Sequence, residues 1–199
     1  MARASFHQAC LGKNVTLNNK RDVATRSETE FCNGYVFLDS PLQPGESLTV
    51  RVLETESSYI GSLAFGLTGA DPRQLLSNDL PDVSDLLSQR PEYWVSTKDV
   101  LPHPQAGDQL CFTLGLDGEV TCSVNGGHHQ VLFHADISIP TRPFIDIFGV
   151  AQKLQLLGVS PAQTSQIISN QNSSKKSAAR PKSCFPDSPD ETKRMCDLP

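Results

Sequence analysis

Apolar and polar residues alternate with a period of two in several segments of the first 158 residues. The clearest of these segments are 46–53, 62–68 and 111–116. Because successive side chains of a strand point to opposite faces, this alternation predicts half-buried strands of an antiparallel sheet. In the last segment, Phe112, Leu114 and Leu116 are expected together on the buried face.

Two dipeptides mark tight turns between the later strands. Asp117-Gly118 and Asn125-Gly126 separate three alternating runs, and both pairs tolerate the positive φ angles that hairpin turns require. Residues 109–134 are therefore predicted to form a three-stranded meander.

Helical signals are confined to two short stretches. Residues 71–76 begin with an Asp cap followed by Pro, and residues 82–87 suggest a similar single turn. No segment sustains a period of 3.6 residues. About ten short strands with regularly spaced turns predict an all-β fold, a two-sheet antiparallel sandwich.

Charge and composition change near residue 158. Residues 1–158 contain 11 Lys/Arg and 18 Asp/Glu, whereas 159–199 contain 6 and 4 and are rich in Ser, Asn, Gln, Lys and Pro. The second stretch has too little apolar surface to offset the entropy of ordering, so we predict an acidic domain and a disordered tail. The acidic balance argues against nucleic-acid binding.

Several features favour a cytoplasmic protein with reduced cysteines. The start of the sequence shows no apolar signal-peptide core, and no run of about 18 apolar residues predicts a membrane span. None of the six cysteines forms a C-x-x-C pair.

The sequence offers little for metal binding or catalysis. His134 and Asp136 share a strand face with His128, but a metal site needs three or four convergent ligands, and no second cluster completes this one. Nucleophile elbows and phosphate-binding glycine loops are not found. We therefore expect no metal, no cofactor and no catalytic residue.

The segment 90–95 (RPEYWV) has the composition of a binding hot spot. It holds the only Trp next to a Tyr and near an Arg, and these residue types dominate protein interfaces. Strand alternation places Tyr93 and Trp94 on opposite faces. Which of the two is buried stays open at this point.

An ordered set of motifs resembles the Neuralized homology repeat over residues 6–158. The set includes Phe6-His7, Gly12 to Leu17, Gly34 to Phe37, Gly61 to Thr68, Arg90 to Val95, Asp117 to Val120, Asn125-Gly126, Phe144 to Gly149 and Leu156 to Gly158. The resemblance implies a SPRY-like, concanavalin-like β-sandwich over 6–158, with 159–199 as the tail.

The resemblance also implies a function in ubiquitination. Repeats of this family recognise partners of Neuralized-type ubiquitin ligases, including the Notch ligands Delta and Jagged, and a RING recruits the ubiquitin-conjugating enzyme. The chain is most similar to a RING-proximal repeat. The tail has only Cys184 and Cys196 where a RING needs paired Cys and His ligands, so we expect recognition and not catalysis.

Candidate partner contacts follow from loops and turns within the matching motifs. They are Arg26, Arg90, Tyr93, Asp117, Asn125 and Arg142. A turn or ion-pair role is equally open for each. The expected partners are proteins, such as Notch-ligand cytoplasmic tails or ligase adaptors. The chain is expected to be a monomer. Binding to such tails would bring it to the periphery of the membrane.

Parts of the sequence also suggest three other functions. A carbohydrate-binding lectin uses the same sandwich architecture, but the usual metal-binding loop is missing. A ligase active on its own would need a catalytic recruiter. The tail residues Lys175, Lys176, Arg180 and Lys182 suit weak contact with acidic lipids, although a solvated linker is the favoured interpretation.

Limited proteolysis tests the predicted boundary. Cleavage is expected within residues 159–199, leaving a resistant fragment that ends near Gly158, because unpacked polar segments are the preferred sites of nicking. Preferential cleavage inside 109–134 would contradict the meander.

Overall fold

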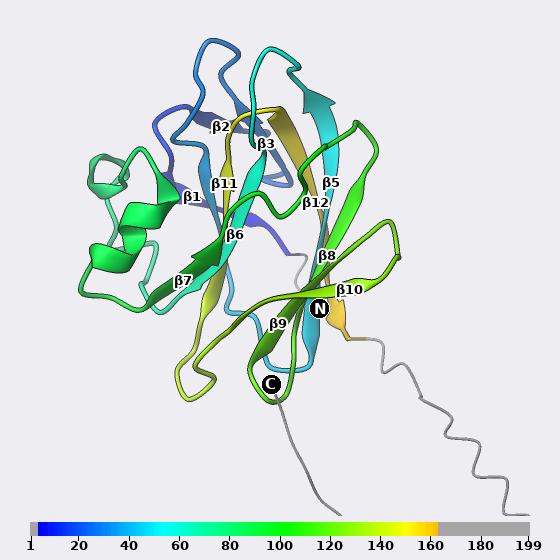
Figure 1. Ribbon diagram of the computed structural model, residues 1–199. Helices are drawn as coiled ribbons and strands as arrows, with labels where there is room; N and C mark the ends of the chain where they lie inside the picture. The colour runs from blue at the N-terminus through cyan, green and yellow to red at the C-terminus, as the bar shows by residue number, and fades with distance from the viewer. Residues whose placement is uncertain (1–3, 163–199) are drawn as a thin grey trace, which may run out of the picture. The chain divides into compact units, whose positions relative to one another are not determined.

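The computed structural model describes residues 4–162, which form two antiparallel sheets packed face to face (Figure 1). The five-stranded sheet has the order β1 (Phe6–Leu11), β4 (Tyr35–Leu38), β11 (Arg142–Ile147), β6 (Leu63–Thr68) and β7 (Trp94–Thr97). The seven-stranded sheet has the order β10 (His129–His134), β9 (Glu119–Val124), β8 (Gln109–Leu114), β5 (Glu46–Thr55), β12 (Ala151–Pro161), β3 (Val23–Arg26) and β2 (Val15–Leu17). The predicted two-sheet sandwich is confirmed.

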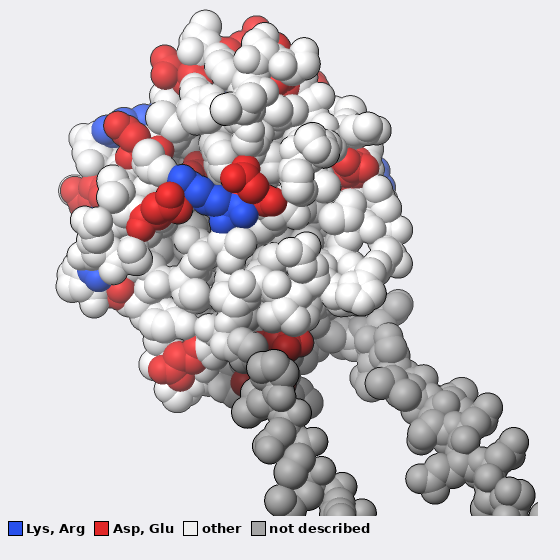
Figure 2. All heavy atoms as spheres, in the orientation of Figure 1, with Lys and Arg blue, Asp and Glu red and all other residues white. Residues whose placement is uncertain are grey.

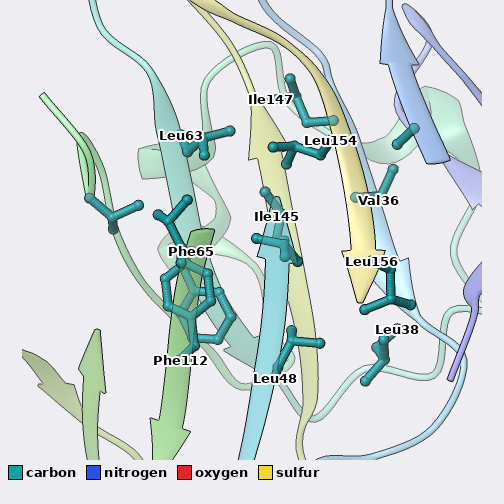
Figure 3. Packing of buried hydrophobic residues seen from close by; sticks show 14 of the residues in the cluster. Val36, Leu38, Leu48, Leu63, Phe65, Phe112, Ile145, Ile147, Leu154 and Leu156 are labelled. Carbon is teal, nitrogen blue, oxygen red and sulfur yellow. The ribbon is translucent and has the colours of Figure 1, made fainter. Parts of the chain in front are cut away.

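The main core lies between the two sheets. Phe65 of β6 stacks on Phe112 of β8 with ring centroids 3.8 Å apart, and aliphatic side chains from both sheets surround the pair (Figure 3). Ile145 of β11 and Leu154 of β12 belong to the same cluster. These are the inward positions of alternating strands, as the period-two pattern predicts.

The predicted meander is confirmed as β8, β9 and β10. Asn125 and Gly126 both have positive φ, and the Gly127 N–H donates to the Val124 carbonyl at 2.8 Å, as in a type I′ turn. The expected burial of Leu116 is wrong. Because β8 ends at Leu114, Leu116 lies in the following turn and is 78% exposed.

A second core covers the outer face of the five-stranded sheet. The segment 69–93, between β6 and β7, packs there. The buried cluster comprises Cys10, Tyr35, Phe37, Ala70, Leu75, Leu80, Leu87, Trp94 and Phe144. The sheet is therefore covered on both sides.

This second layer corrects the prediction that residues 62–68 have one wet face. All six residues of β6 are buried, and a side chain at Gly66 would stand only 2.4 Å from the ring of Phe144. The layer also settles the open question at the aromatic pair, because Trp94 is buried and Tyr93 is half-buried.

Helical structure in residues 4–162 consists of two short 3₁₀ helices, η1 (Ser77–Asp79) and η2 (Ser84–Gln89). The turn predicted at 82–87 is confirmed as η2, shifted by two residues. At 71–76 the predicted cap is present, because the Asp71 side chain accepts the Arg73 N–H and its carbonyl accepts the Gln74 N–H, but the stretch forms a single turn and not a helix. No helix in this part of the chain is long and apolar enough to cross a membrane.

The last strand continues past the expected domain end. In β12, Pro161 lies opposite Glu46, and the Ala162 N–H donates to the Gly45 carbonyl at 2.8 Å. A protease-resistant fragment should accordingly end after Pro161. The predicted disordered tail and its basic patch lie outside the described residues, apart from 159–162.

Replacing Trp94 with Ala tests the second core. We expect the free energy of unfolding to fall by about 3–5 kcal/mol, because the change empties a large buried volume between the sheet and segment 69–93. Urea denaturation followed by far-UV circular dichroism measures it. Leu76→Ala, at an exposed position of the same segment, is the control and should change stability by about 0.5 kcal/mol or less. Equal losses of unfolding free energy in Trp94→Ala and Leu76→Ala would contradict the burial of the five-stranded sheet on both faces.

Candidate functional site

The six partner-binding candidates do not form one site. Asn125 directly follows β9, at the end of the sandwich where β3, β5, β7, β9 and β11 finish. Tyr93, Asp117 and Arg142 lie near the opposite end, and Arg90 belongs to segment 69–93. We call these the upper and lower ends. A single partner segment does not reach both.

Most of these side chains already have partners inside the domain. Arg90 pairs with Glu92 at 3.0 Å and donates to the Asp79 carbonyl at 2.7 Å. The Tyr93 hydroxyl accepts from the Asp136 N–H at 2.9 Å.

The two hairpin residues have turn roles as well. Asp117 accepts the Glu119 N–H at 3.1 Å. Asn125 accepts the Gln109 N–H at 2.8 Å and donates to Asp108 at 2.9 Å. Arg142 is half-buried, in a small pocket that it shares with Asp71 and Arg73.

Arg26 requires a correction, because its side chain is completely buried and is not accessible to a partner. Its Nη2 donates to the carbonyls of Gly149 at 2.6 Å and Ala151 at 3.1 Å, and its guanidinium lies 5.4 Å from the centre of the Tyr59 ring. Burial lowers its pKa below the usual range. Arg26 thus positions the turn between β11 and β12.

That turn, residues 148–150, holds two further loops in place. The Gly149 N–H donates to the Phe31 carbonyl at 3.1 Å, and the Val150 N–H donates to the Gly61 carbonyl at 2.9 Å. Gly149 has a φ of +60°, and a side chain there would stand 2.3 Å from the Ile60 carbonyl oxygen. Only glycine fits such a close approach.

The loops fixed in this way enclose a pocket of about 380 Å³ at the upper end, which we call the loop-end pocket. Its lining consists of Phe31, Cys32, Ile60, Gly61, Asp82, Val83, Lys98, Asp99, Asp146 and Phe148. Three apolar lining residues stay exposed, namely Ile60 (83%), Phe31 (42%) and Val83 (41%). Exposed apolar groups around a pocket are typical of a binding site.

The sequence carries only a weak signal for these residues. Phe31 and Ile60 are single apolar residues within polar loops, in SETEFCNG and ETESSYIGS. An apolar residue within a polar loop was the signal by which the sequence could have indicated these positions. It carries no information about which loops meet in space.

Carboxylates dominate the polar part of the loop-end pocket. Asp146, on β11, is only 2% exposed, and its Oδ1 accepts the Gly34 N–H at 3.1 Å. Burial raises the pKa of Asp146 to about 6, and the Gly34 hydrogen bond opposes that rise. Lys98 pairs with Asp85 at 2.9 Å and lies 5.7 Å from the centre of the Phe148 ring.

The histidine cluster considered for a metal is dispersed. The nearest carboxylate to His134 Nε2 is Glu119 at 3.9 Å, whereas Asp136 accepts from the N–H and hydroxyl of Ser138. Across residues 4–162, no group of three or more His, Cys, Asp or Glu residues is arranged to hold a metal ion. The geometry of the loop-end pocket suits the non-covalent binding of an apolar side chain beside a polar group.

Comparisons with known proteins identify relatives. The Neuralized family model matches residues 6–158. The protein neuralized of Drosophila melanogaster is 46% identical over 151 residues, which cover 76% of this chain and 20% of that protein. The human E3 ubiquitin-protein ligase NEURL1B is 40% identical over 163 residues, or 80% of this chain and 29% of that protein. The chain therefore spans less than a third of either relative.

The fold also matches a solved structure. The crystal structure of the Drosophila melanogaster neuralized NHR1 domain superimposes with a TM-score of 0.69 at 22% identity. The match covers 79% of this chain and 99% of that domain. At this identity the likeness shows a shared fold.

Substituting Arg26 with Met tests its positioning role. Met keeps an apolar stem but removes the donors to Gly149 and Ala151, so unfolding should become easier by about 3 kcal/mol. Urea denaturation monitored by the fluorescence of the single Trp measures the change.

Arg142→Met is the matched control for this substitution. The Arg142 guanidinium is half-buried and makes no hydrogen bond among residues 4–162, so a loss below about 1 kcal/mol is expected. If Arg26→Met unfolds at the same urea concentration as the wild type, the role assigned to Arg26 is refuted.

Proposed function

The chain belongs to the Neuralized family, and from this premise we propose that it is a protein-interaction module that recognises substrates or adaptors for ubiquitination. A relative named as an E3 ubiquitin-protein ligase supports the link to ubiquitination. The observation that carries the proposal is the loop-end pocket, with three exposed apolar residues on loops that a buried arginine holds in place.

Physical reasons favour this pocket as the recognition surface. Its loops project from a sandwich with two packed cores, so binding requires little ordering of the module. Apolar side chains at the centre of an interface contribute most of the affinity when a partner excludes water from them. Asn125 lies at the same end of the sandwich but does not line the pocket. The other candidates are secondary because their side chains make contacts inside the domain or lie at the lower end; they are Arg90, Tyr93, Asp117 and Arg142.

The proposed partners are cytoplasmic protein segments. Notch-ligand tails of the Delta and Jagged type and ligase adaptors are the first to test. In this proposal the chain selects the target and ubiquitin transfer takes place on another component.

Ile60→Asp provides the direct test. A charge at the most exposed apolar position of the pocket should weaken binding to a synthetic Delta cytoplasmic tail by about 2 kcal/mol, or roughly thirtyfold. Fluorescence polarisation with the 199-residue chain measures the dissociation constant. Stability should stay unchanged, because the side chain at this position faces water.

Leu116→Asp is the matched control for Ile60→Asp. Leu116 is equally exposed, lies in the turn between β8 and β9 at the lower end, and should leave the affinity unchanged. A loss of binding in Leu116→Asp alone would move the site to the lower end and refute the proposal.

A further inference from the structure

Carboxylates outnumber basic groups in the lining of the loop-end pocket. Asp82, Asp99 and Asp146 each accept one hydrogen bond from a neutral N–H group, at 2.9, 3.1 and 3.1 Å respectively. None of them forms an ion pair within residues 4–162, because Lys98, the one basic residue of the lining, pairs with Asp85 outside it. Lys98 and Arg26 attract the Asp146 carboxylate without forming an ion pair with it, so the lining keeps an excess of negative charge.

Burial of the ionised carboxylate costs the most free energy at Asp146, compared with Asp82 and Asp99. It is 2% exposed, and a buried carboxylate loses its hydration without compensation unless a cation or several donors approach it. Its Oδ1 accepts the Gly34 N–H, and the Ser84 hydroxyl is the second group that donates to the carboxylate. Because Asp146 lines the pocket, a group that enters the pocket can approach it.

A buried hydroxyl group near Asp146 lacks a hydrogen-bond partner within the described residues. Tyr35 lies opposite Asp146 in the β4–β11 register, and Tyr35 Oη has no hydrogen-bond partner there. A hydroxyl oxygen accepts as well as donates, so a ligand group that donates, such as a basic side chain, satisfies it.

The surrounding loops carry the same sign of charge. The segments 27–34, 56–62, 82–86, 98–99 and 146–150 together contain seven Asp or Glu residues and one Lys. Figure 2 shows more acidic than basic groups on the face that it presents. An excess of negative charge attracts basic segments and repels acidic ones.

We propose that the loop-end pocket selects a partner segment in which a lysine or arginine stands next to an apolar side chain, and that Asp146 receives the basic group. The apolar side chain packs against Phe31, Ile60 and Phe148. This inference rests on the proposed function, since it names the chemistry of the partner for the same site. It predicts that recognition depends on a short sequence feature of the target.

Proton binding provides a second signature of the same contact. The titratable and charged groups that face Asp146 are Arg26 from β3, Cys32 in the loop before β4, Tyr35 at the start of β4, Asp82 before η2, and Lys98 after β7. A basic partner binds the ionised form of Asp146, so a proton must leave first when the pH is below about 6. Affinity should therefore fall about tenfold between about pH 7.5 and pH 5.

The experiment uses an array of short synthetic peptides and the 199-residue chain. Each peptide carries Leu or Phe beside one variable position, occupied by Lys, Arg, norleucine, Gln or Glu. Lys and Arg peptides should bind at least about tenfold more tightly than the norleucine peptide, which keeps the length but lacks the charge. Asp146→Asn should lose this preference and the pH dependence while keeping the requirement for Leu or Phe.

Controls separate recognition from folding. Asn still accepts the Gly34 N–H, and the thermal midpoint of Asp146→Asn reports its folding. Asp99→Asn, at an exposed position of the lining, reduces the preference in part and serves if Asp146→Asn unfolds. Asp117→Asn at the lower end should bind as the wild type does.

The possible failures are distinguishable. If norleucine or Glu peptides bind as tightly as Lys peptides, and Ile60→Asp still abolishes binding, the charge preference is refuted while the proposed function stands. If the array shows no apolar requirement and Ile60→Asp leaves capture of the Delta tail intact, both proposals fail. A preference for basic residues that persists in Asp146→Asn and Asp99→Asn refutes the assignment to this pocket.

Discussion

The burial of strand β11 on all sides is the constraint on which the rest of the domain depends. Its edges pair with β4 and β6, Ile145 and Ile147 face the main core, and Phe144 packs in the second core, 5.3 Å from the centre of the Trp94 ring. A strand with apolar side chains on both faces needs cover on both faces, since each large side chain contributes about 1.5–3 kcal/mol through burial. The segment 69–93 supplies the outer cover and is therefore structural.

The same strand connects the cores to the proposed binding surface. Asp146, near the end of β11, lines the loop-end pocket. The turn that follows β11 is hydrogen-bonded to Arg26 and to the loops that contain Phe31 and Gly61. A buried guanidinium without good partners is strongly destabilising, so its hydrogen bonds to two carbonyls fix the turn geometry closely. The exposed apolar residues gain a rigid base, which lowers the entropic cost of binding.

The parts of the fold that local patterns determine are predictable from the sequence. Asn125-Gly126 specified a hairpin through its tolerance of positive φ, and alternation specified which side chains of β5 and β8 face the core. The predictions for Arg26 and for residues 62–68 were wrong for a common reason. Both depend on distant segments: Arg26 binds carbonyls more than 120 residues away, and β6 belongs to a sheet that segment 69–93 covers. The loop-end pocket could not be predicted because four loops and one strand end contribute to it. These segments are distant in the sequence, and local patterns do not show that they contact one another.

Chemical-shift mapping of a bound partner tests the central claim most directly, because it reports every contacted residue without prior choice. In ¹H–¹⁵N spectra of the chain titrated with a Delta cytoplasmic tail, the account predicts the largest shifts at Phe31, Ile60, Val83 and Lys98, around the loop-end pocket. The amides of residues 115–118 and 136–141 at the lower end should keep their positions. Large shifts confined to the lower end would contradict the account.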